Sequence, residues 1–343
     1  MKRLLALLLV LLMLFAFVGC NKDIDNNNKT GKPESSATVD SASKGDNEKE
    51  DADNKDDDKQ GTSAPVLYKA TDDKGNVVWL FGSIHVGRDD FYPLPSYVMD
   101  AYNGSDALAV EFDIIAFEKD IQAQMDALSA LVYKDGSKIS MHIDKETYDA
   151  AVSILKENKS YNSNLDYYIP AMWSSFVDQC SYEKLDVDTD NGIDKHLLKL
   201  AKKEDKKILN VESPELQYGM LADYSEELQI YMLESSVESY NNFEEDRKML
   251  DQMIDAWASG DEESLVKLLN EEEEFESEEE EKLYEEYNNA MIVERNRYMA
   301  AYAEKMLKSG KEVFICVGSA HILGEGAVAD LLKDKGYTVE RVR

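Results

Sequence analysis

The sequence predicts an α/β fold with a central, mostly parallel or mixed β-sheet, flanked by helices and carrying a large helical insertion or cap. Short, continuously apolar runs recur along residues 66–343, with long helical stretches between them. Such runs are typical of strands buried on both faces of a sheet, and their alternation with helices is typical of a parallel layer. No solenoid period, glycine-rich phosphate loop or Gly-x-Ser-x-Gly element occurs, so repeat, nucleotide-binding and simple serine-hydrolase classes lack their motifs.

The expected elements follow one another along the chain. Two apolar runs separated by the polar turn Asp72–Asn76 predict a β-hairpin. Further apolar runs predict buried strands, with stretches of helical period between them. The series is a hairpin at 66–70 and 77–81, a short helix after Pro95, a strand at 107–112, helices over 115–205, a strand at 207–211, helices over 214–308, a strand at 312–317, a helix at 324–335 and a strand at 337–341.

Residues 1–20 predict an export signal. Lys2 and Arg3 precede the apolar run Leu4–Val18, which is shorter than the about 20 residues that span a bilayer. Cys20 lies where a bacterial lipobox places its acylated cysteine, although Phe17 replaces the usual leucine. We therefore expect an extracytoplasmic lipoprotein, anchored to the bacterial membrane through a lipid on Cys20. The alternative is an uncleaved N-terminal anchor, which also places the rest of the chain outside the cytoplasm.

Residues 21–62 predict a flexible tether, because a segment so rich in Asp, Asn, Lys and Ser cannot bury enough apolar surface to offset its ordering entropy. Residues 63–343 remain for one folded domain. The chain carries a net charge of −32; the signal contributes +2 and the tether holds 12 acidic residues against 7 lysines, so the domain carries about −29. This charge argues against nucleic acid or an anionic lipid surface as partner. The acidic block 271–286 is expected to be a solvated helix face or loop rather than a calcium site.

The cysteines provide neither a disulfide nor a zinc site. Besides Cys20, only Cys180 and Cys316 occur. Both lie in apolar surroundings, one in a helical stretch and one in an expected strand. We expect both to be small buried hydrophobic residues.

Two of the four histidines share one local pattern. His85 and His321 each end a hydrophobic-Gly-Ser-x-His sequence, with Gly82 and Gly318 as the glycines, directly after an expected buried strand. In an open α/β sheet, groups just past the carboxyl ends of strands face a common crevice, and a glycine lets the backbone approach its neighbours. Neutral imidazole is the commonest protein ligand of metals. The duplicated pattern therefore predicts a divalent metal site (Mn, Co or Zn).

Glu111 is the expected third ligand. It ends another buried strand, where a lone carboxylate is costly. Two imidazoles and a carboxylate with an open position are typical of a catalytic rather than a structural metal site. The alternative is that His85 and His321 cap helices or are satisfied core residues.

These motifs together resemble the TraB/PrgY/GumN family, which includes the Tiki metalloproteases. Paired Gly-x-x-His motifs near the two ends of the domain carry the resemblance. Three further segments match in order: Gly192–Asp194 resembles the family's Gly-Val-Asp, Val211–Gln217 its Leu-Glu-x-x-x-x-Gln with Val in place of Leu, and Glu294–Asn296 its Glu-Arg-Asn. The similarity extends from Leu67 to Val342.

The resemblance implies roles for individual residues. His85, Glu111 and His321 would hold a metal that activates a water molecule. Glu212 would act as general base or additional ligand. Arg295 would stabilise an oxyanion or bind a substrate carboxylate, with Asn296 hydrogen-bonding nearby; the alternative for Arg295 is an ion pair with Glu212 or Glu294.

Three other polar residues are expected to be structural. Asp194 is predicted to cap its helix rather than to take part in chemistry. His142 and His196 lack the strand-end setting and are expected to be structural or exposed.

The leading hypothesis is a surface-tethered metal-dependent hydrolase, by preference a peptidase acting on extracellular peptides or protein termini. One alternative is a non-catalytic protein that binds a peptide pheromone or haem. Another is a hydrolase that resembles the erythromycin esterases. The combination of two histidines with Glu111, Glu212 and Arg295 favours catalysis, because a binding protein needs no such concentration of polar groups.

Overall fold

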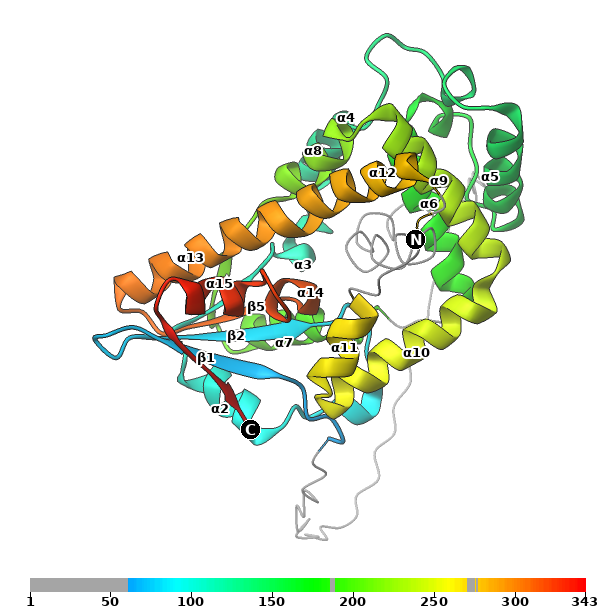
Figure 1. The fold of residues 1–343 in the computed structure, drawn as a ribbon. Helices are drawn as coiled ribbons and strands as arrows, with labels where there is room; N and C mark the ends of the chain where they lie inside the picture. Colours follow the sequence, from blue (N-terminus) through cyan, green and yellow to red (C-terminus); the bar gives the residue numbers. More distant parts are fainter. Residues whose placement is uncertain (1–60, 186–188, 270–274, 276) are drawn as a thin grey trace, which may run out of the picture. The chain divides into compact units, whose positions relative to one another are not determined.

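A computed structural model describes residues 61–185, 189–269, 275 and 277–343 (Figure 1). Its centre is a six-stranded sheet with the order β4-β3-β5-β2-β1-β6. The strands are β1 (Leu67–Thr71), β2 (Val77–Ser83), β3 (Ala107–Val110), β4 (Lys207–Asn210), β5 (Val313–Gly318) and β6 (Thr338–Val342). The predicted signal peptide, Cys20 and almost all of the predicted tether lie outside the described residues.

The sheet is mixed, and the predicted α/β class is confirmed. Strands β4, β3, β5 and β2 run parallel, whereas β1 pairs antiparallel with both β2 and β6. The predicted hairpin is β1–β2. One strand differs from its expectation: β4 was expected to be buried, but it is an edge strand, with its two end residues exposed and its two middle residues half-buried. Lys207 and Asn210 face solvent there, which suits an edge.

Helices cover both sides of the sheet (Figure 1). Helices α13, α14 and α15 lie on one side, and α2 and α7 lie on the other. This arrangement buries the apolar strands on two faces, which explains why they read as continuous hydrophobic runs. These helices are α2 (Ser96–Gly104), α7 (Ile193–Lys203), α13 (Arg295–Ser309), α14 (Ser319–Ile322) and α15 (Val328–Asp334). Two short helical elements lie between β2 and α2 and directly after β3, namely η1 (Asp89–Phe91) and α3 (Ile114–Phe117).

The predicted helical insertion contains a second hydrophobic core, formed by residues between Ile139 and Tyr240. Trp173 is fully buried in it, and its Nε1 donates to the Leu165 carbonyl oxygen at 2.8 Å. Residues 271–274 and 276 of the predicted acidic block lie outside the described residues. Glu278–Glu281 form the first turn of α12, where acidic side chains suit the helix dipole, and all but the half-buried Glu280 are exposed. The elements are α4 (Ile121–Ser129), η2 (Ile139–Met141), α5 (Lys145–Glu157), η3 (Leu165–Tyr167), α6 (Pro170–Leu185), α8 (Pro214–Asp223), α9 (Glu226–Asn241), α10 (Phe243–Ser259), α11 (Glu262–Leu269), α12 (Glu278–Asn288) and the π-helical η4 (Asn289–Glu294).

The two cysteines of the folded domain lie where the sequence predicts them. Cys180 and Cys316 are both buried free thiols, as predicted. Within the described ranges, no helix combines the length and the apolar character that crossing a membrane requires.

A buried carboxyl group lies inside the helical layer. Asp178 of α6 is 4% exposed and lies near the hydroxyls of Ser174 and Ser236. Burial, reinforced by the nearby Asp246, raises the pKa of Asp178 to about 8 despite these serines. The Tyr182 hydroxyl lies near both carboxyls, and burial raises its pKa as well.

Replacing Asp178 with Asn should therefore change how stability depends on pH. Between the ordinary pKa of 3.8 and about 8, folded Asp178 keeps a proton that the unfolded chain loses, so stability falls as the pH rises through this window. Because one pH unit corresponds to about 1.4 kcal/mol, Asp178→Asn should gain on the order of a few kcal/mol over wild type between pH 5 and pH 8. Urea unfolding at both pH values measures this, with exposed Asp126→Asn as control. Equal behaviour of the two variants would contradict the prediction.

Candidate functional site

The two motif histidines follow neighbouring parallel strands. Strands β2 and β5 are paired so that Ser83 lies opposite Gly318. The chain continues from these ends to His85 and His321, which both line one small cavity of about 40 Å³. A space of that size holds a water molecule or a single ion. The sequence prediction that these distant imidazoles reach one place is therefore met by the geometry.

His321 is held in one defined tautomer. Its side chain is 1% exposed, and its Nδ1 lies 2.8 Å from Asn296 Oδ1. Because the Asn296 Nδ2 donates to the Gly326 carbonyl oxygen, Asn296 Oδ1 accepts, and the proton resides on His321 Nδ1. Burial and the nearby Arg295 lower the pKa of His321 to about 3, so the ring is neutral. Its Nε2 lone pair is buried and has no hydrogen-bond partner among the described residues.

His85 is oriented by Asp194. Its Nδ1 lies 3.1 Å from Asp194 Oδ2, and both side chains are nearly buried. Burial disfavours the charged imidazole, but the Asp194 carboxylate outweighs burial and raises the pKa of His85. The predicted capping role of Asp194 is wrong: Gly192 is the N-cap of α7, and no side chain caps that helix end. Asp194 lies in the first turn, where it faces the histidine instead.

Gly192 has a steric reason to be glycine. A Cβ at this position would lie 2.5 Å from the carbonyl oxygen of His85, closer than any side chain tolerates. The adjacent Ile193 N–H donates to the Ile84 carbonyl oxygen at 3.0 Å. The start of α7 is thereby fixed directly against the His85 loop.

The motif glycines Gly82 and Gly318 serve different purposes. A Cβ on Gly82 would lie 2.9 Å from Ser319 Oγ and 3.0 Å from its Cα, so Gly82 permits the close approach of the two strand ends. A Cβ on Gly318 would meet Glu111 and His321 only at ordinary contact distances. The contribution of Gly318 is its backbone N–H, which donates to Glu111 Oε1 at 3.0 Å.

Arg295 bridges two buried carboxylates. Glu111 follows β3 and Glu212 follows β4, and the Glu212 N–H donates to the Glu111 carbonyl oxygen, which continues the pairing of the two strands. Arg295 Nε and Nη2 donate to the two oxygens of Glu212 at 2.9 and 2.7 Å. The same Nη2 donates to Glu111 Oε2 at 2.7 Å. Gln217 Nε2 lies 2.9 Å from both carboxylates. The predicted ion pair of Arg295 with Glu212 is therefore present.

The charges in this cluster stabilise one another. Burial disfavours ionised Glu111, but Arg295 outweighs burial and lowers the pKa of the carboxyl group to about 2. Burial acts against the charge of Arg295 as well, and Glu111 and Glu212 raise its pKa above the ordinary value. Two carboxylates with one guanidinium leave a net negative cluster next to the two imidazoles.

The donors present suit a divalent metal, although they are not assembled as a complete site. A neutral imidazole with an unpartnered, buried Nε2 is the group that a metal such as zinc prefers. The second imidazole of the pair lines the same cavity. The described ranges contain no group of three His, Cys, Asp or Glu side chains close enough to hold an ion. Both oxygens of the predicted third ligand, Glu111, accept hydrogen bonds from Arg295, Gln217 or Gly318.

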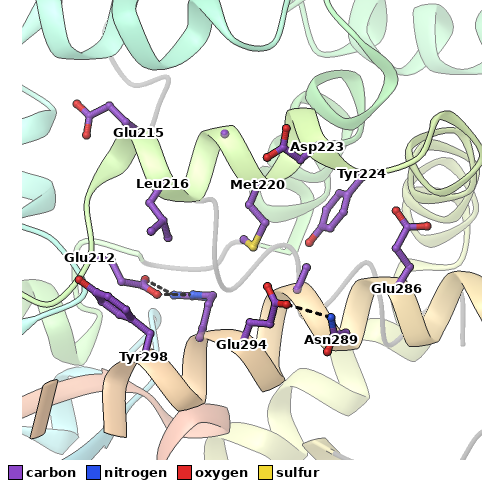
Figure 2. Close-up of a pocket in the computed structure, with 13 residues that line it drawn as sticks. Glu212, Glu215, Leu216, Met220, Asp223, Tyr224, Glu286, Asn289, Glu294 and Tyr298 are labelled. Carbon is purple, nitrogen blue, oxygen red and sulfur yellow. Dashed lines mark hydrogen bonds and ion pairs between the residues drawn. The ribbon is translucent and has the colours of Figure 1, made fainter. Parts of the chain in front are cut away.

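An open pocket of about 610 Å³ adjoins the carboxylate cluster, as Figure 2 shows. It lies between α8 and the continuous α12–η4–α13 segment, and Glu212 and Arg295 form part of its lining. The π-helical turn η4 immediately precedes Arg295, and π turns often mark functional sites. This turn contributes Asn289, Ala290 and Glu294 to the wall of the pocket.

Sequence reasoning placed six side chains at the site: His85, Glu111, Glu212, Arg295, Asn296 and His321. It overlooked two positioning residues. Asp194 was assigned to a helix cap, and Gln217 was noted only as part of a motif. The spacing between Glu212 and Gln217 could have revealed the role of Gln217. Ser213 caps α8, and the first turn of this helix brings the Gln217 side chain back to the strand ends. His142 and His196 instead stack on Tyr133 and Tyr92, respectively, in agreement with the structural role predicted for them.

Comparisons with known proteins agree with the motifs. The family model described as the TraB/PrgY/gumN family matches residues 66–341. Two similar curated proteins are both named "Uncharacterized protein YbaP", from Escherichia coli (strain K12) and Shigella flexneri. Each is 24% identical over 256 residues, which cover 74% of this chain and 87% of the relative. No solved structure matches the chain. Since the family match covers nearly the whole described part, the chain belongs to the TraB/PrgY/GumN family.

Proposed function

We propose that this protein is a metal-dependent hydrolase that cleaves peptides outside the cytoplasm, tethered to the membrane through a lipid on Cys20. The observation that carries the proposal is the buried, unpartnered Nε2 of neutral His321 in a cavity shared with His85. A lone pair buried without a partner is costly unless a ligand uses it. The residues that would hold the metal are His85, His321 and Glu111.

The remaining residues support hydrolysis by positioning and charge. A divalent metal, when bound, supplies Lewis-acid activation of water and of a carbonyl oxygen. Arg295 lines the open pocket, and the next residue, Asn296, hydrogen-bonds to His321, so a guanidinium at this place suits a developing oxyanion. Asn296 and Asp194 keep the two imidazoles in fixed orientations. Glu212 holds Arg295 through two hydrogen bonds, and its part as general base or extra ligand stays a prediction.

One observation favours a non-catalytic binding protein instead. Both oxygens of Glu111 and both of Glu212 accept hydrogen bonds from Arg295, Gln217 or Gly318. Carboxylates satisfied in this way can serve purely to stabilise the fold, while the open pocket binds a peptide without turnover. Metal content and cleavage separate the two functions.

His321→Ala should abolish both metal binding and cleavage while the protein stays folded. We expect stoichiometric metal in the wild-type protein after reconstitution with Mn²⁺, Co²⁺ or Zn²⁺, and cleavage of members of a peptide library. Loss of a direct ligand should lower metal affinity by more than the roughly 10–100-fold that loss of an outer-shell partner causes. Elemental analysis and mass spectrometry of the digested library measure the two properties. His85→Ala should behave alike.

His142→Ala is the matched control, because His142 lies away from the site, stacked on Tyr133 and paired with Glu226. It should retain metal and cleavage. Normal activity of His321→Ala would exclude the proposed site. Absence of both metal and cleavage in the wild-type protein would favour the binding function.

Asn296→Ala should weaken metal binding without removing a ligand. The His321 Nδ1–H loses its acceptor, so the ring is free to rotate or change tautomer. We expect about a 10–100-fold loss of metal affinity, and Asn296→Asp should restore much of it because a carboxylate oxygen also accepts this proton. Competition titration with a chelating dye measures the affinities. Unchanged affinity in Asn296→Ala would show that this hydrogen bond does not orient the ligand.

Arg295→Leu should destabilise the protein by about 3–5 kcal/mol at pH 7, because it leaves buried carboxylates unpaired. The loss should diminish in acid. Since the folded-state pKa of Glu111 is about 2 against an ordinary 4.5, its stabilising contribution is complete above about pH 4.5 and disappears as the pH falls toward 2. Urea unfolding at pH 7 and pH 3 measures this, and adding Glu111→Gln should recover part of the loss at pH 7. A small effect at pH 7 would contradict the bridging role.

A further inference from the structure

The open pocket beside Glu212 and Arg295 is strongly acidic. Four further carboxylates line it, and α8, α12 and η4 contribute them from both sides (Figure 2). Among the described residues, Arg295 is the only basic one in its lining, and it already pairs with Glu111 and Glu212. The four are Glu215, Asp223, Glu286 and Glu294. Within the described residues none of these four forms an ion pair with a lysine or arginine, so no basic side chain neutralises their charge there.

One of these carboxylates is held rigidly. Glu286 accepts hydrogen bonds from both the backbone N–H and the hydroxyl of Ser225 at 2.7 Å. These donors are neutral, so they fix the side chain without cancelling its charge. Glu215, Asp223 and Glu294 are solvent-exposed around it. An acidic field of this kind, focused in a pocket, raises the local concentration of cations.

Tyr224 gives a second, independent indication of a ligand. It is 95% buried, its exposed fraction being 5%, and its hydroxyl has no hydrogen-bond partner among the described residues. In Figure 2 this side chain extends from the end of α8 toward η4, into the pocket that it lines. A buried hydroxyl without a partner is costly, and a ligand in the pocket can relieve that cost.

Apolar surface accompanies the charge. Leu216 and Tyr298 are 44% and 51% exposed, and both line the pocket together with Met220. They come from α8 and α13, on opposite sides of the opening. A ligand that satisfies both features carries a positive charge next to an apolar group.

We propose that this pocket is the subsite for a lysine or arginine side chain of the peptide substrate, with an apolar residue beside it. The inference rests on the proposed function and specifies its substrate class. The carboxylates bind the cationic group, Tyr224 supplies a hydrogen bond, and Leu216 and Tyr298 contact the apolar neighbour. The same field disfavours acidic peptides, because like charges brought together cost affinity. A peptide bond next to the bound residue is then presented toward Arg295.

The test measures binding separately from cleavage. In the full-length protein carrying His321→Ala, which removes turnover, fluorescence anisotropy compares two labelled decapeptides that differ only by Lys or Gln beside one leucine. The Lys peptide should bind about 10-fold more tightly at low salt, and the difference should shrink as added salt screens the charges. The triple variant Glu215→Gln, Asp223→Asn, Glu294→Gln should abolish this preference.

A second acidic pocket provides the matched control. It has a volume of about 590 Å³, lies at α5 and α9, and is lined by Glu146, Glu234 and Glu238 among others. Changing these three to Gln alters the net charge by the same amount, so a general electrostatic effect would appear in both triple variants. The control variant should keep the preference for the Lys peptide.

The outcomes separate this inference from the proposed function. Equal binding of the two peptides, or equal loss in both triple variants, overturns the cationic subsite. Spermidine binding without binding of either peptide overturns it as well and assigns the pocket to small amines. Selective binding of the Lys peptide supports it, even where the wild-type protein cleaves nothing; that combination overturns the hydrolase proposal alone.

Discussion

The contact between Arg295 and two carboxylates is the constraint on which the rest of the site depends. Parallel pairing of β3 with β4 continues one step past the strands and brings Glu111 and Glu212 side by side. Two buried carboxylates repel each other unless a cation lies between them. Arg295 can reach both only if α13 begins directly above the strand ends. Its next residue, Asn296, is then positioned to bind His321. One ion cluster thereby locates the helix that orients the His321 imidazole.

Much of this arrangement could be predicted because the signals are local in sequence. Apolar runs identify strands, and the carboxyl ends of parallel strands converge whatever the intervening helices do. That rule was sufficient to bring His85, Glu111 and His321 to one edge of the sheet. The predicted fold class and the hairpin are confirmed because they too depend on local apolar runs. The edge position of β4 could not be predicted from the sequence. Strand order depends on how the connecting helices pack over the sheet, and the four residues of β4 carry little information about that packing.

The residues that were missed act across the fold. Asp194 was assigned to a helix cap because acidic residues near helix starts usually are, but Gly192 already takes that position to let the His85 backbone approach. Gln217 acts by donating to Glu111 and Glu212, which requires that the ends of two strands lie side by side. The π turn at η4 inserts one residue that no periodicity reveals, and it changes which side chains of the helix face the pocket. Each depends on contacts between segments far apart in the chain.

The hydrogen bonds of Arg295 distinguish its two partners. Glu212 is bound by Nε and Nη2 together, a two-point contact that favours a fixed geometry. Glu111 receives only a shared Nη2 hydrogen bond from the guanidinium, and its other oxygen is held by the Gly318 N–H. Releasing Glu111 therefore costs Arg295 one contact and leaves the pair with Glu212 intact. Of the two carboxylates, Glu111 makes the weaker contact with Arg295, while Glu212 holds the guanidinium in the lining of the open pocket.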